Sequence, residues 1–150
     1  MVNGFKMLVA FSLVVIMMIM YRVPITIKIL YVIPVFMILL LVSFAFSTIL
    51  LHFGVFVEDL ANVVTVLLKL VFYLSGIFYN IVKRVPAPYN NYLLKMNPMA
   101  LIMNDLRNTM LYGADPHFKA LALWAVLGII ISLVGMKIIY KYENSYVKVI

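Results

Sequence analysis

The sequence predicts an all-α integral membrane protein with four transmembrane helices and one re-entrant or interfacial helix. Hydrophobic residues make up 67% of the chain, charged residues only 11%, and the mean hydropathy is +1.14. A soluble domain cannot bury that much apolar surface. Uncharged stretches cover 7–21, 29–51 and 120–136, and about 20 helical residues cross a bilayer. Because these stretches are apolar on every side, without the alternation of barrel strands, we expect helices.

The first two spans are expected at about 5–21 and 28–52. The first is followed by Arg22 and Pro24, a charge and a proline that suit a helix end at a membrane surface. No small-residue cleavage site follows, so we interpret this stretch as a retained span and not as a signal peptide. Pro34 lies near the start of the second span and predicts a kink or a late helix start.

The third span is expected at about 59–80 and opens with Glu58 and Asp59, whose charges suit the positive end of a helix dipole. Along it, polar, small and aromatic residues recur at steps of three and four and predict one stripe. A lysine near mid-membrane is unfavourable by about 2.5 to 3.5 kcal/mol, so Lys69 should face protein or water. The stripe consists of Asn62, Thr65, Lys69, Phe72, Gly76 and Tyr79.

Residues 83–117 differ from the spans, because they are rich in proline and only moderately hydrophobic. Asn97 and Pro98 are typical of a helix start, and Gly113 followed by Pro116 of a stop. The helix so delimited is about 21 Å long, too short to cross, and should lie in the interface or enter partway and return. Its apolar side holds Met99, Ile102, Met103, Leu106 and Met110, and its polar side Asn104, Asp105, Arg107 and Asn108.

The last span is expected at about 118–140, followed by a polar tail. Gly128, Ser132 and Gly135 form a strip of small residues that suits close helix packing. Four spans place both chain ends on one side of the membrane. More Lys and Arg residues lie on the opposite side, so the positive-inside rule alone would place the chain ends outside.

The formal net charge of +7 does not indicate nucleic-acid binding, because the basic residues lie at span ends, where they reach lipid phosphates. The chain has no cysteine, and its histidines, His52 and His117, are far apart along the chain and are expected to lack acidic or cysteine partners, so no metal site is expected. Glu58 and Asp59 are adjacent and point to different faces of a helix, so no catalytic residues are expected.

Several short motifs follow one another in order along the chain. They are the acidic pair Glu58-Asp59, a Tyr-Leu-Ser-Gly-Ile-Phe-Tyr segment at 73–79, Val-Pro at 85–86, Asn-Pro-Met at 97–99 and Leu-Arg-Asn at 106–108. In order and spacing they resemble the C-terminal half of ABC-2 type transporter permeases, in the branch that exports polysaccharide and teichoic acid (polyol phosphate). The resemblance covers nearly the whole chain, although those permeases have six spans. Glu58 stands where they usually have arginine, and Gly76 where they usually have proline.

The resemblance implies a multi-pass protein of the bacterial cytoplasmic membrane, with both ends and the 52–59 loop cytoplasmic and residues 83–117 extracellular. It also implies a homodimer of the full-length permease, contact with membrane lipids, a lipid-linked polysaccharide substrate and a separate ATP-binding subunit. The sequence has no glycine-rich phosphate-binding loop. The chain is therefore expected to be a transport subunit that holds no cofactor, with ATP bound by its partner, and not an enzyme.

Each group of candidate residues has two interpretations. The stripe, together with Ser75, would line the substrate path, with Lys69 attracting phosphate and Phe72 and Tyr79 stacking on sugar rings; alternatively it is a packing seam in which Lys69 pairs with an acid of another span. The outer residues would guide an anionic polymer or anchor the chain to headgroups. This outer group consists of Lys83, Arg84, Lys95, Asn97, Pro98 and Arg107.

Glu58 and Asp59 would contact the ATPase subunit or simply cap their helix. Two other functions stay open for the whole chain. One is an ABC-2 exporter of drugs or small lipids, and the other is a four-span accessory membrane protein outside the ABC class.

Overall fold

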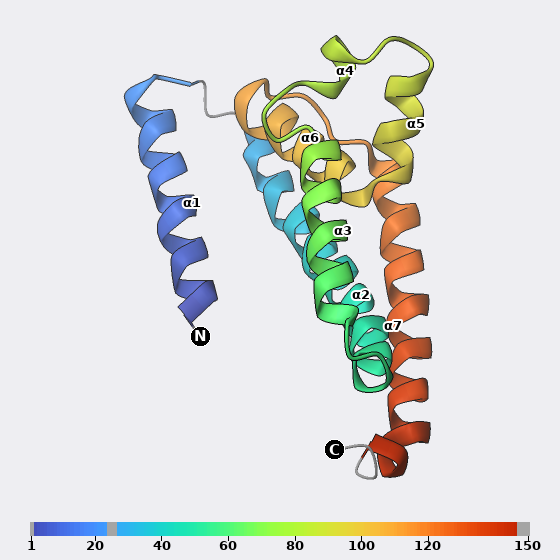
Figure 1. The fold of residues 1–150 in the computed structure, drawn as a ribbon. Coiled ribbons are helices and arrows are strands. Elements are labelled where there is room, and N and C mark those ends of the chain that lie inside the picture. Colours follow the sequence, from blue (N-terminus) through green and yellow to red (C-terminus); the bar gives the residue numbers. More distant parts are fainter. Residues whose placement is uncertain (1, 24–26, 147–150) are drawn as a thin grey trace.

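The computed structural model describes residues 2–23 and 27–146, and every regular element in these ranges is helical (Figure 1). Within these ranges, α2 and α7 form the long axis of the bundle, and α4, α5 and α6 gather at one end of it. The elements are α1 (Val2–Met20), the 3-10 helix η1 (Ile27–Tyr31), α2 (Val32–Phe56), α3 (Leu60–Leu74), α4 (Ile81–Arg84), α5 (Tyr89–Met96), α6 (Pro98–Leu111) and α7 (Phe118–Tyr146).

Two helical stretches are long and apolar enough to cross a membrane. They are Ile27–Phe56 and Phe118–Tyr142, with mean hydropathies of 2.8 and 2.3. In the most apolar run of 18 residues of each stretch, only 22% and 17% of the residues are buried inside the chain. Most of their apolar side chains therefore face outward. Both stretches agree with the predicted spans 28–52 and 118–140. The second starts late, as one interpretation of Pro34 predicted: η1 precedes α2, and Pro34 lies in the first turn of α2.

The α2–α7 seam is closed by small residues. A Cβ atom added to Gly128 would lie 3.1 Å from Leu41 Cγ, and one added to Gly135 would lie too close to the Thr48 side chain to be accommodated. The two contacts are seven residues apart on both helices and follow the same order, so α2 and α7 run parallel with a heptad-like spacing. Ser132 lies between them on α7 and is also buried. The predicted packing strip is therefore confirmed, with α2 as its partner.

The direction of the helices agrees with alternating spans. In Figure 1, α1 and α3 run toward the end that carries α4, α5 and α6, whereas α2 and α7 run away from it. The first helix ends at Met20, close to the predicted 21, and Arg22 follows with a positive φ of 50°. Pro24, which we predicted as part of this stop, lies outside the described residues.

The prediction of a third helix reaching residue 80 is wrong, because α3 ends at Leu74. Gly76 follows with φ of +66°, a conformation that L side chains rarely adopt, and the chain turns there. A Cβ at position 76 would lie 2.6 Å from Ile81 Cγ1, so the turn also needs a residue without a side chain. A proline at this position would not reproduce this turn, since proline fixes φ near −65°.

The segment between α3 and α7 forms three helices, where the sequence predicted one. Its apolar residues build the core at this end of the bundle with Val35 and Leu121 of the long helices. The predicted helix at 98–112 is α6, and Gly113 ends it with φ of +58° while the Ala114 N–H donates to Asn108 O. Two residues of its predicted polar side, Asn104 and Asp105, are both buried. They turn inward because α6 crosses α2 and is covered on more than one side.

Candidate functional site

The polar stripe of α3 faces away from the rest of the chain. Asn62, Thr65, Lys69 and Phe72 are all exposed and share one side of the helix, whereas the least exposed residues, Leu60, Val64 and Val71, lie on the opposite side. No side chain of α3 is buried. The Thr65 hydroxyl donates to Ala61 O at 2.8 Å, so it is satisfied within the helix. Neither ion pair found among the described residues includes Lys69.

The stripe stops at Phe72, because the helix does. Ser75, Gly76 and Tyr79 were predicted to continue it, but they belong to the turn after α3. Ser75 is buried and its hydroxyl donates to Val71 O. The Tyr79 hydroxyl donates to Tyr73 O at 3.2 Å, and the Phe72 ring meets the Phe78 ring edge to face at 5.6 Å. Ser75, Gly76 and Tyr79 therefore shape the turn and do not extend the exposed face of α3.

Arg107 clamps this turn from the side of α6. Its guanidinium donates to three backbone carbonyls, those of Gly76 at 3.1 Å, Ile77 at 3.2 Å and Tyr79 at 3.3 Å. These carbonyls lack a helical partner because α3 has ended. A guanidinium is suited to this task, since it offers five N–H donors in a rigid plane. The sequence predicted Arg107 as an outer residue for substrate, whereas here its donors hold the end of α3.

The helix start at Asn97 and Pro98 is confirmed. The Asn97 side-chain oxygen accepts from the N–H groups of Met99 at 3.0 Å and Ala100 at 3.3 Å, and Pro98 takes the first helical position. This is the role of an N-cap. Both residues are therefore explained by local structure, and the pattern in the sequence identified them correctly.

Lys83 and Arg84 form the last turn of α4 and are exposed. Lys95 is exposed at the end of α5. Its backbone oxygen accepts the indole N–H of Trp124 at 3.0 Å, which ties α5 to α7. The charged ends of these three side chains thus lie at the surface, while the backbone of the three residues is held in α4 and α5.

At the other end of the bundle, Glu58 and Asp59 are exposed in the turn between α2 and α3. Asp59 occupies the N-cap position of α3, but its side chain makes no capping hydrogen bond. A capping hydrogen bond therefore does not explain Asp59, whereas the favourable position of both charges at the start of the helix is as predicted. A groove of about 260 Å³ opens beside Glu58 between the two helices, and its lining consists of Leu50, Gly54, Val57, Glu58, Leu60, Ala61 and Val64.

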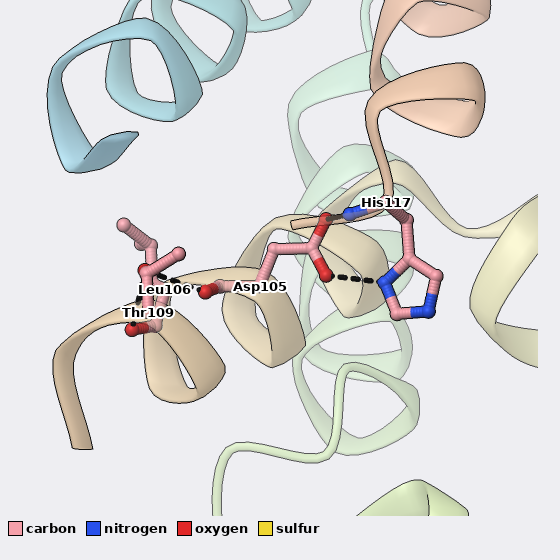
Figure 2. Close-up of polar contacts among 4 residues, drawn as sticks. All are labelled: Asp105, Leu106, Thr109 and His117. Carbon is pink, nitrogen blue, oxygen red and sulfur yellow. Dashed lines mark hydrogen bonds and ion pairs between the residues drawn. The ribbon is translucent and has the colours of Figure 1, made fainter. Parts of the chain in front are cut away.

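The sequence missed a buried carboxylate that joins α6 to α7 (Figure 2). Asp105 is fully buried, and one of its oxygens lies 2.6 Å from His117 Nδ1 while the other accepts the His117 backbone N–H at 3.0 Å. Thr109 donates to the Asp105 backbone oxygen at 2.7 Å. The expectation that His117 has no acidic neighbour is wrong, because the turn after α6 folds it back over the helix. Asp105 and His117 are twelve residues apart, and the sequence does not predict how the turn between them folds. Nothing in the sequence therefore indicated this contact.

The ring of His117 is half-exposed, so its second nitrogen is directed away from the carboxylate. Over the part of the chain that the structure describes, no group of three His, Cys, Asp or Glu residues is placed to hold a metal ion. Comparison of the chain with known protein families, with curated proteins and with solved structures gives no match.

Proposed function

We propose that the chain is a transmembrane permease subunit of an ABC exporter, which moves lipid-linked polysaccharide or teichoic acid across the bacterial cytoplasmic membrane. The observation that supports this best is the stripe on α3. Asn62, Thr65 and Lys69 lie on an otherwise apolar helix and point away from the helices of their own chain. Lipid would be an unfavourable neighbour for Lys69. Water in a path, or a second subunit, would satisfy it.

In this proposal four helices cross the membrane, namely α1, α2, α3 and α7. The third is short, because 15 residues reach only about 22 Å of the roughly 30 Å of an apolar core. Its last turn and the following loop would then lie within the membrane, where free carbonyls need partners from protein. Arg107 supplies them, which explains why a charged side chain points to neutral oxygens.

The substrate path would run along the stripe at a contact between two subunits of the complete permease. Lys69 would attract the phosphate of the substrate, and Phe72 would stack on its sugar rings. A separate ATPase subunit would dock at the opposite end, beside Glu58 and the groove between α2 and α3. ATP binding there would move α2 and α3 relative to each other.

The membrane arrangement can be tested directly, because the chain has no cysteine. The single-cysteine variants Asp59→Cys and Asn91→Cys are treated, in intact cells, with a membrane-impermeant maleimide. Only the cysteine at position 91 should react. Permeabilised cells should show labelling at both positions. Labelling of both in intact cells would remove α3 from the list of spans and with it the path.

The transport function needs a separate assay of polymer export in cells that also produce the ATPase subunit. Lys69→Met should slow export of a phosphate-bearing polymer strongly, and Lys69→Glu should abolish it, with equal amounts of protein in the membrane. Val66→Met is the matched control, since position 66 is also exposed on α3 but is already apolar. Normal export by Lys69→Met would contradict a role of this lysine in the path.

A further inference from the structure

The short helix α5 has one face that is fixed to the protein and another that is free. Leu94 is buried on one side of the helix. On the opposite side, Tyr89, Tyr92 and Met96 are 68%, 63% and 76% exposed, and Leu93 packs against the core at the edge of this side. Their spacing of three and four residues places them in one row. We call this row the α5 face.

The depth of α5 follows from its contact with α7. Trp124 donates to Lys95 O, and it lies six residues, about 9 Å, along α7 from Phe118. The helix that carries it is long and apolar enough to cross a membrane. Met96, next to Lys95, therefore lies within the first turns of the apolar span, and Tyr89, about 10 Å back along α5, lies close to the start of that span (Figure 1).

The charge of this region has one sign. From Asn80 to Asn97 the chain contains Lys83, Arg84 and Lys95 and no acidic residue. All three basic side chains are exposed. Tyrosine and tryptophan concentrate where a membrane meets water, and basic residues there pair with anionic phosphates.

From this combination of depth, aromatic row and charge, we infer that the α5 face, with Lys83, Arg84 and Lys95, binds the anionic headgroups of the membrane surface. The tyrosine rings lie at the headgroup level, Met96 reaches the acyl chains, and the basic side chains contact lipid phosphate. The inference rests on the membrane placement in the proposed function but not on transport. It makes α5, and not α6, the interfacial helix of the segment between α3 and α7.

The experiment uses the full chain reconstituted in vesicles, with an environment-sensitive fluorophore on Tyr92→Cys as the only thiol. In phosphatidylcholine vesicles, lipids brominated near the headgroup should quench the fluorophore more than lipids brominated deep in the chain. Adding phosphatidylglycerol should increase this quenching, and added salt should reverse the increase. Each basic residue near an anionic surface changes the affinity for that surface about fivefold.

Lys83→Gln/Arg84→Gln/Lys95→Gln should abolish the phosphatidylglycerol effect. The matched control, Lys6→Gln/Lys137→Gln/Lys141→Gln, also removes three exposed basic residues and should keep it. Quenching without any dependence on phosphatidylglycerol or salt would overturn the inference, and so would a fluorophore that no lipid quenches. Shielding that appears only at high protein density would assign the α5 face to a second copy of the chain instead.

Normal headgroup quenching together with normal export by Lys69→Met would leave this inference standing and contradict the substrate path.

Discussion

The α2–α7 seam and helix α3 are both apolar, yet they are packed in opposite ways. The seam is closed by glycine, alanine, serine and threonine, with Ala45 only 1% exposed and Thr48 5% exposed. On α3 no residue is buried, and Val66 is 64% exposed. The contact between α2 and α7 is therefore fully packed within the chain, whereas the side chains of α3 stay exposed. Small residues allow backbones to approach closely, whereas the larger side chains of α3 keep their surface for another partner.

The two regions are also fixed differently. The seam is held along its length by contact between side chains. The third helix is held at its ends, by the short turn at Glu58 and by Arg107 on the carbonyls after Gly76. A helix that is fastened only at its ends can change its tilt without breaking a packed core. This difference suits a rigid pair of helices beside a movable one.

The largest effect is expected from closing the seam with a bulky residue. Gly135→Leu should destabilise the protein by about 3 kcal/mol or more, because its Cβ alone would overlap the Thr48 side chain. Thermal unfolding in detergent should show the loss. Gly54→Ala is the control, since a Cβ there meets only Leu60 Cδ2 at 3.8 Å and should change little. Equal stability of both variants would show that α2 and α7 are not closely packed.

A smaller effect is expected where Arg107 holds α3. Arg107→Met removes three hydrogen bonds from a charged donor and should cost about 2 kcal/mol in stability. Arg107→Lys keeps the charge but cannot reach three carbonyls in a plane, so it should recover less than half of this loss. Lys119→Met, at an exposed position, is the control. If Arg107→Lys is as stable as the unmodified protein, the positive charge, and not the three hydrogen bonds, stabilises the end of α3.

The Asp105 contact joins α6 to the start of the seam and gives a third, weaker test. Asp105→Asn keeps a side-chain oxygen for one of the two His117 contacts and should cost about 1 kcal/mol, whereas Asp105→Ala loses both and should cost about 2 kcal/mol. Chemical denaturation in micelles can measure both values. The same loss in the two variants would show that the hydrogen bonds contribute nothing beyond the charge.

The sequence predicted the long helices well, because unbroken apolar stretches have few alternatives. It also located the α6 start at Asn97 and the packing strip around Ser132, since both depend on local patterns. It did not predict the early end of α3. The apolar pattern continues to Tyr79, and only the contact of Gly76 with Ile81 shows why the chain must turn. The pairs Arg107–Gly76 and Asp105–His117 join separate elements, so no local pattern indicates them.

The smallest effect is expected on the free surface of α3, and it sharpens the comparison because the same substitution can be made in both regions. Val42→Ala, in a side chain only 3% exposed on α2, should cost about 1 to 2 kcal/mol through lost packing and a cavity. Val66→Ala, on α3, should change the stability of the isolated chain by less than about 0.5 kcal/mol. Unfolding of the two variants in the same detergent measures this difference. If Val66→Ala costs as much as Val42→Ala, α3 is already covered within one chain, and its stripe has no room for a substrate or a second subunit.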